Sequence, residues 1–162
     1  MANVRITTNT TGTQPVIKIG MAGANLANAL ITITIPFVQD VTVTNSTGVY
    51  SYSTFTDVDM RKLSTPADNE ISTNVVLDEE TWFGNAGAAA NSAVFYGLSY
   101  LSINKNDLDF QINYNGPNVG AYITNGGGFI TSLAPTTSPD APVWISPLSI
   151  AVDGALTNGV QV

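Results

Sequence analysis

The sequence holds few side chains that could do chemistry. It contains no histidine and no cysteine, so the commonest general base and the Ser–His and Cys–His nucleophile arrangements are excluded. Zinc or copper sites built from imidazole or thiolate are excluded for the same reason. Carboxylate, lysine and tyrosine chemistry remain. The composition therefore predicts a protein that is not an enzyme, with no catalytic, cofactor-binding or metal-binding residues.

Two pairs of aspartates are the best remaining candidates for a site. Asp57 with Asp59, and Asp107 with Asp109, each lie two residues apart, so each pair shares a face if its segment is extended. Paired carboxylates can bind Ca²⁺ or act as the acid and base of a glycosidase. Neither pair lies in a glycine-turned loop of regularly spaced oxygen ligands, which favours a solvated strand face. A third interpretation is an acidic wall along a channel, which requires the protein to form a ring.

Aromatic residues and a glycine run give weaker signals. Tyr50 and Tyr52 could stack a sugar or a base, or pack across strands. Trp82 and Phe83 could anchor a partner or fill the core. Gly126–Gly128 lacks the Lys-Ser/Thr that follows a phosphate-binding loop, so we expect a sharp hairpin turn there.

Composition indicates one domain with a weakly charged surface. The chain has 162 residues, of which only 10% are charged, against about 25% in average proteins. Its polar surface must therefore consist mostly of Thr, Ser, Asn and Gly, which suits either packing against copies of itself or an ordinary Thr/Asn-rich β protein. A net charge of −7 argues against a grip on phosphate backbones. No apolar run is long enough to span a membrane, and the start lacks a signal-peptide pattern.

Alternation of apolar and polar residues dominates the chain and predicts strands. It is clearest in DLDFQINYNG, residues 107–116, and recurs in LITITIP, residues 30–36, and at Val41–Thr44, after which Asn45–Gly48 predicts a turn. Further strands are expected at residues 16–19, 49–55, 72–77, 121–124, 128–133 and 143–152. The fold class is therefore mostly β: an antiparallel β-sandwich or barrel.

One segment breaks the β pattern. Ala90, Val94, Leu98 and Leu101 recur at helical spacing, which predicts one short flanking helix over about residues 86–100. The acidic run Asp78–Glu80 precedes it and would be favoured near a helix N-terminus.

Two regions carry no strand or helix signal. Residues 1–14 are Thr- and Gly-rich, which predicts a flexible arm. Residues 60–70, MRKLSTPADNE, contain a proline and two of the five basic residues, which predicts a long loop.

A family resemblance rests on the order of these segments. A strand (STNVVLDEE), an alanine-rich helix (GAAANSAVFYGL) and an alternating strand (DLDFQINYNG) follow one another, and GFITSLAPTTSPDAPVWISPLSIAVDGALTNG completes the chain. In this order, over residues 70–157, the sequence resembles the tail tube (major tail) proteins of long-tailed bacteriophages.

The resemblance implies a virion structural protein. Copies would form hexameric rings, stacked into a tube through which DNA passes without specific binding, and other virion proteins would join them. The acidic residues expected to face the lumen are Asp57, Asp59, Asp107 and Asp109. The residues expected to grip the next ring are Arg61, Lys62, Leu63 and Pro66, together with the first fourteen residues. Alternatives are a capsid cement or decoration protein, a carbohydrate-binding β-sandwich using Tyr50, Tyr52 or Trp82, and an enzyme with paired carboxylates.

Overall fold

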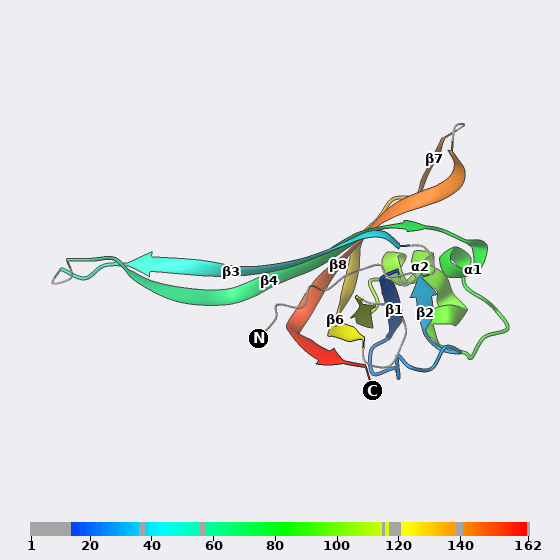
Figure 1. Ribbon diagram of the computed structural model, residues 1–162, viewed down its shortest axis with the longest axis horizontal. Helices are drawn as coiled ribbons and strands as arrows, with labels where there is room; N and C mark the ends of the chain where they lie inside the picture. The colour runs from blue at the N-terminus through cyan, green and yellow to red at the C-terminus, as the bar shows by residue number, and fades with distance from the viewer. Residues whose placement is uncertain are drawn as a thin grey trace, which may run out of the picture.

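The residues that the structure describes form a single antiparallel sheet and two short helices (Figure 1). The computed structural model describes residues 14–35, 38–55, 58–114, 116, 121–138 and 141–161. The elements are β1 (Val16–Met21), β2 (Ile33–Ile35), β3 (Val38–Tyr52), β4 (Arg61–Val76), α1 (Glu79–Phe83), α2 (Ala93–Ile103), β5 (Leu108–Asn113), β6 (Tyr122–Leu133), β7 (Thr136–Ser138) and β8 (Ala141–Val160). The sheet order is β2-β1-β5-β6-β8-β4-β3, with β7 paired to β8. The predicted mostly β, antiparallel fold is confirmed, but the expected sandwich or barrel is not closed, because the eight strands of the described residues form one open sheet.

One face of the sheet carries the core. The alternation of β5 places Phe110 beside Ile19 of β1, and farther along the sheet Ile71 of β4 pairs with Ile150 of β8. All four side chains are buried. Helix α2 covers this face with Leu98 and Leu101, which are also fully buried. Because neighbours in a strand point to opposite faces, the other face is left for polar residues.

The prediction of a single helix over about residues 86–100 is wrong in number and bounds, because the region contains two helices, α1 and α2. Asp78 caps α1 by accepting a hydrogen bond from the backbone N–H of Thr81 (2.7 Å), and Ser92 caps α2 through the N–H of Phe95 (3.1 Å). Between the helices, the Asn85 side chain accepts a hydrogen bond from the N–H of Gly87 (2.8 Å). Such local bonds compete with helix formation despite the alanines. Gly97, with φ of 74°, kinks α2.

The expected turn at Asn45–Gly48 is instead strand, and so is the expected loop at residues 60–70 from Arg61 onward. β3 and β4 form one long hairpin that extends far beyond the rest of the sheet (Figure 1). Pro66 is accommodated because the register shifts there: Thr47 pairs with Ala67 and Val49 with Ser64. At this β-bulge, Pro66 does not need to donate a backbone hydrogen bond to the neighbouring strand, which a proline cannot do. In the projecting part of this hairpin, residues 45–52 and 61–69, both faces are largely exposed, so burial imposes no alternation of apolar and polar residues there.

Glycines in β6 were also expected to form a turn, which is wrong. β6 runs through Gly126–Gly128 without interruption, and Gly126 pairs with Phe110 of β5. A β-carbon at Gly126 would lie 2.6 Å from Cζ of Phe110. The glycine therefore makes room for a core aromatic ring on the neighbouring strand.

In the described part of the chain, neither helix has the length and apolar character needed to cross a membrane. The predicted arm at residues 1–14 lies almost wholly outside the described residues, which begin at Gln14.

Candidate functional site

The polar face of the sheet, opposite the helices, is the first candidate surface. Its rungs follow from the strand register: Lys18 pairs with Gln111, which pairs with Asn125. The Gln111 amide donates a hydrogen bond to the side-chain oxygen of Asn125 (2.9 Å). Apart from its charged residues, this face is built from amides, hydroxyls and glycines, which carry dipoles but no net charge.

Carboxylates supply most of the charge on the polar face. One rung places Asp109 of β5 and Asp153 of β8 on either side of Gly127. The N–H of Gly23 donates a hydrogen bond to Oδ2 of Asp109 (2.6 Å), which fixes that carboxylate. Asp153 is exposed.

Two further carboxylates lie on β3 and β4. Asp40 accepts hydrogen bonds from the backbone N–H (2.8 Å) and the side-chain amide (2.9 Å) of Asn74. Glu70 is exposed and pairs with Ala151 of β8. With Lys18 as the cation of β1, the polar face is acidic.

The three described members of the four predicted acidic residues do not lie together on one surface. Asp109 lies on the polar face, but Asp107 is an exposed residue in the connection before β5. Asp59 lies in the bend at the far end of the β3–β4 hairpin, and Asp57 lies outside the described residues. Asp153, Glu70 and Asp40 were missed because their places on one face depend on pairing between distant strands. No three acidic side chains among the described residues come close enough to hold a metal ion.

The second candidate surface is the projecting part of the hairpin, residues 45–52 of β3 and 61–69 of β4, which we call the ribbon. Residues 61–69 of β4 pair only with β3 in the part of the chain described, because pairing with β8 begins at Glu70. Arg61, Lys62, Leu63 and Pro66, expected in a loop, all lie on this strand and are exposed. Their cross-strand neighbours could not be predicted from the sequence: Tyr52 lies opposite Arg61, and Tyr50 lies opposite Leu63.

The aromatic residues weighed as a sugar site are divided between two places. Tyr50 and Tyr52 stack on the ribbon with centroids 6.2 Å apart. Trp82 lies in α1, at the other end of the molecule (Figure 1). Trp82 is half-buried and its neighbour Phe83 is 71% exposed, so neither belongs to the central core.

Comparison with known proteins identifies the fold. No family model and no curated protein sequence matches the chain. Solved structures do match. A chain from the tail of an empty gene transfer agent particle, refined with C6 symmetry, superimposes with a TM-score of 0.61 at 16% identity, over 93% of this chain and 99% of that one.

Two other structures agree with it. A chain of the native gene transfer agent virion gives a TM-score of 0.60 at 17% identity, over 93% of this chain and 99% of that one. The SPP1 tail tube gives 0.59 at 13% identity, over 90% of this chain and 77% of that one. The predicted resemblance is thus confirmed at the level of the fold: this chain has the fold of tail and tail tube subunits.

Proposed function

We propose that the protein is a tail tube subunit of a virion or virus-like particle, and that its copies join into rings stacked as a tube. The observation that carries the proposal is the match over nearly the full length of a chain from a C6-symmetric tail. Full-length correspondence leaves little of the chain for a separate activity. We infer a structural role, in contact with copies of itself and with other proteins of the particle.

The open sheet supports ring formation. Its outermost strands are β2 and β3, at opposite ends of one continuous order. An edge strand presents unpaired N–H and C=O groups that invite another strand. Pairing β2 of one copy with β3 of the next would join the sheets of a ring into a continuous barrel. The two edges are different surfaces, and contact between different surfaces closes into a ring when the rotation permits.

The polar face supports the role of a conduit. We infer that this face, with Asp109, Asp153, Glu70 and Asp40, lines the lumen, while the helices face outward. Repeated around each ring, its carboxylates would repel the phosphate backbone of DNA. The exposed amide and hydroxyl groups would keep the wall hydrated, so that DNA slides along it without specific binding.

Electron microscopy of the purified protein in negative stain tests the proposal. We expect hollow rings or tubes, and six-fold symmetry in averaged end-on views. A chain that stays monomeric in sedimentation velocity experiments at every concentration tested, and shows no rings, would overturn the proposal. Trimers that bind purified capsids would instead favour the cement-protein alternative.

A further inference from the structure

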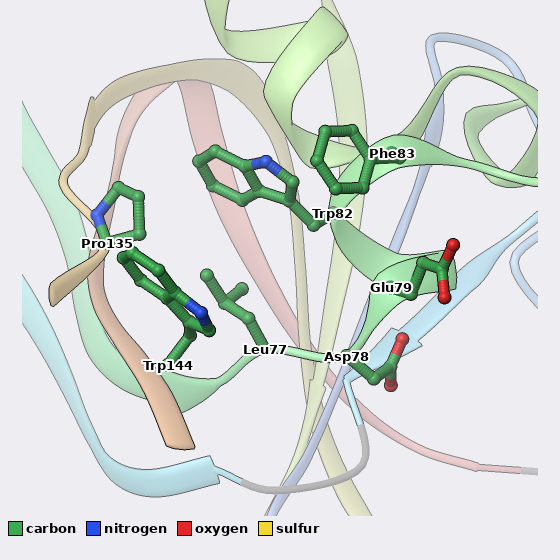
Figure 2. A pocket seen from close by; sticks show the side chains of 7 residues that line it. All are labelled: Leu77, Asp78, Glu79, Trp82, Phe83, Pro135 and Trp144. Atoms are coloured by element: carbon green, nitrogen blue, oxygen red, sulfur yellow. The ribbon is translucent and has the colours of Figure 1, made fainter. Parts of the chain in front are cut away.

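An aromatic groove lies between α1 and the β7–β8 hairpin. Its apolar walls enclose a cavity of about 410 Å³ and are formed by Leu77, Trp82, Phe83, Pro135 and Trp144; we call it the Trp82–Trp144 groove. Figure 2 shows Trp144 and Pro135 on one side, Trp82 and Phe83 on another, and Leu77 between them. A cavity of this volume falls within the range of small-molecule sites.

Backbone hydrogen bonds hold the walls of the groove in place. The N–H of Leu77 donates to the carbonyl of Trp144 (2.9 Å), which ties the end of β4 to β8. The N–H of Trp82 donates to the carbonyl of Asp78 (3.0 Å) within the first turn of α1. The rings of Trp82 and Phe83 meet edge to face, with centroids 6.4 Å apart. The groove is therefore formed before any ligand arrives.

The groove offers aromatic surface to a ligand. The protein has two tryptophans, and both line the groove. Trp144 is 53% exposed and Phe83 is 71% exposed, so the core of the protein does not use these rings. The face of an aromatic ring carries partial negative charge and attracts cations.

The charges at the groove favour the same kind of ligand. Asp78 and Glu79 stand at its edge, and both are exposed. In the part of the chain that the structure describes, no lysine or arginine lines the groove. The described basic residues lie in β1, on the ribbon and after α2: Lys18, Arg61, Lys62 and Lys105. The carboxylates are therefore not neutralised by a neighbour, and a bound cation would be attracted to them.

The apolar walls discriminate between kinds of cation. A primary ammonium group is strongly hydrated and has three N–H donors that need acceptors. The carbonyl of Trp144 already accepts from Leu77, and indole N–H groups can only donate. A quaternary ammonium group has no N–H and spreads its charge over methyl groups, which pack against aromatic rings. The groove suits the quaternary group better.

We propose that the Trp82–Trp144 groove binds a quaternary ammonium group. Its methyl groups lie against the indole rings of Trp82 and Trp144, and Asp78 and Glu79 offset its charge from the edge. This site goes beyond the proposed role in a tail tube and does not rest on it. Each chain carries a complete groove, so binding requires no assembly.

Titration with choline tests the site, because the two tryptophans report on the groove alone. The matched control ligand is dimethylbutanol, in which a carbon atom replaces the charged nitrogen at the same shape. At constant ionic strength, we expect choline to change the tryptophan emission and to bind at least about fivefold more tightly than dimethylbutanol. Equal affinities, or no binding of choline, would overturn the proposal. A blocked lysine that binds more tightly than choline would overturn the assignment to a quaternary group.

A change of one ring tests the aromatic contribution. Trp144→Leu keeps an apolar side chain but removes the aromatic face, and is expected to abolish the preference for choline over dimethylbutanol. Trp144→Phe keeps a ring and is expected to retain most of that preference. Calorimetric titration measures both variants, because one fluorophore is lost, and urea unfolding checks that both remain folded. An unchanged preference in folded Trp144→Leu contradicts the proposal.

A change of one carboxylate tests the charge contribution. Glu79→Gln is expected to weaken choline binding by up to about fivefold, the usual range for an exposed ion pair, and to leave dimethylbutanol binding unchanged. Glu80→Gln is the matched control, since Glu80 is the next residue but does not line the groove. Its carboxylate accepts a hydrogen bond from the Asn85 amide (3.0 Å) instead. Equal weakening by both changes would mean that net charge, and not the groove, attracts choline.

The quaternary group occurs both in free molecules and on lipid headgroups, and vesicles separate these sources. Phosphatidylcholine vesicles carry the group, whereas phosphatidylglycerol vesicles lack it. An emission change with choline but with neither vesicle assigns the groove to a free cation. A change with choline and with phosphatidylcholine vesicles alone shows that the groove also admits a headgroup. An equal change with both vesicles, and none with choline, would overturn the proposal.

Discussion

Phe110 of β5 lies across Gly126 of β6, so closely that a β-carbon at Gly126 would stand 2.6 Å from Cζ of the ring. Phe110 is fully buried and is the largest such side chain in the core. The glycine and the ring therefore form one packing unit across two strands.

Gly126→Ala is expected to lower the free energy of unfolding by about 1–3 kcal/mol, the range for overpacking a core. Gly127→Ala is the matched control: its β-carbon would make only ordinary contacts, 3.5 Å from Asp109 Oδ1. We expect the control to lie within about 0.5 kcal/mol of wild type. Urea unfolding curves measure both. In a Phe110→Leu background, which shortens the ring side chain, the added cost of Gly126→Ala should fall; an undiminished cost would contradict the packing explanation.

Gly97→Ala should be more damaging, because two penalties combine. Gly97 has φ of 74°, and its β-carbon would meet the backbone of α1, 2.6 Å from the carbonyl carbon of Phe83. We expect a loss of about 3 kcal/mol or more in unfolding free energy, since backbone cannot move aside as a side chain can. Gly154→Ala separates the two penalties, because Gly154 has φ of 90° and open space around it. That control should lose only about 1 kcal/mol, and equal losses would show that the helix contact is unimportant.

The N-cap of α1 gives a third prediction. Asp78→Ala removes the hydrogen bond from Thr81 N–H and is expected to cost about 1 kcal/mol. Asp78→Asn keeps a side-chain oxygen in place and should cost only a few tenths of that. Glu79→Ala, which deletes the neighbouring carboxylate without touching the cap, serves as the control. The measurement is again urea unfolding, and equal losses for Asp78→Ala and Asp78→Asn would mean that charge rather than capping stabilises α1.

The acidic polar face gives a prediction about DNA. Asp153→Lys with Glu70→Lys should leave assembly intact, because both side chains are exposed, but should make assembled tubes retain DNA. Retention should weaken as the salt concentration rises. The slope of the logarithm of the binding constant against the logarithm of salt concentration should steepen by about 0.9 for each phosphate contacted. Asp59→Lys, in the bend at the far end of the β3–β4 hairpin, makes the same kind of change away from this face and should not retain DNA. If tubes with and without the polar-face lysines release DNA alike, the face does not line the lumen.

Much of the sheet could be predicted from the sequence. The predictions that were wrong share one physical cause. β5 was found because its two faces differ: Leu108, Phe110 and Ile112 are buried while Asp109 and Gln111 point outward. The ribbon was missed because both of its faces are exposed, so no alternation marks it as strand. The glycines of β6 were misread because the need for them arises from Phe110, on another strand.

The candidate surfaces were only partly predictable for the same reason. Asp109 was identified from its own strand, whereas Asp153 joins it only through the pairing of β6 with β8. Spacing along the chain contains no record of which strands become neighbours.

The two edge strands of the sheet, β2 and β3, differ fivefold in length: three residues against fifteen. A strand contact between β2 of one copy and β3 of another can therefore occupy only a short part of β3. The rest of that edge keeps its unpaired backbone groups, so one edge of the sheet can serve two partners at the same time.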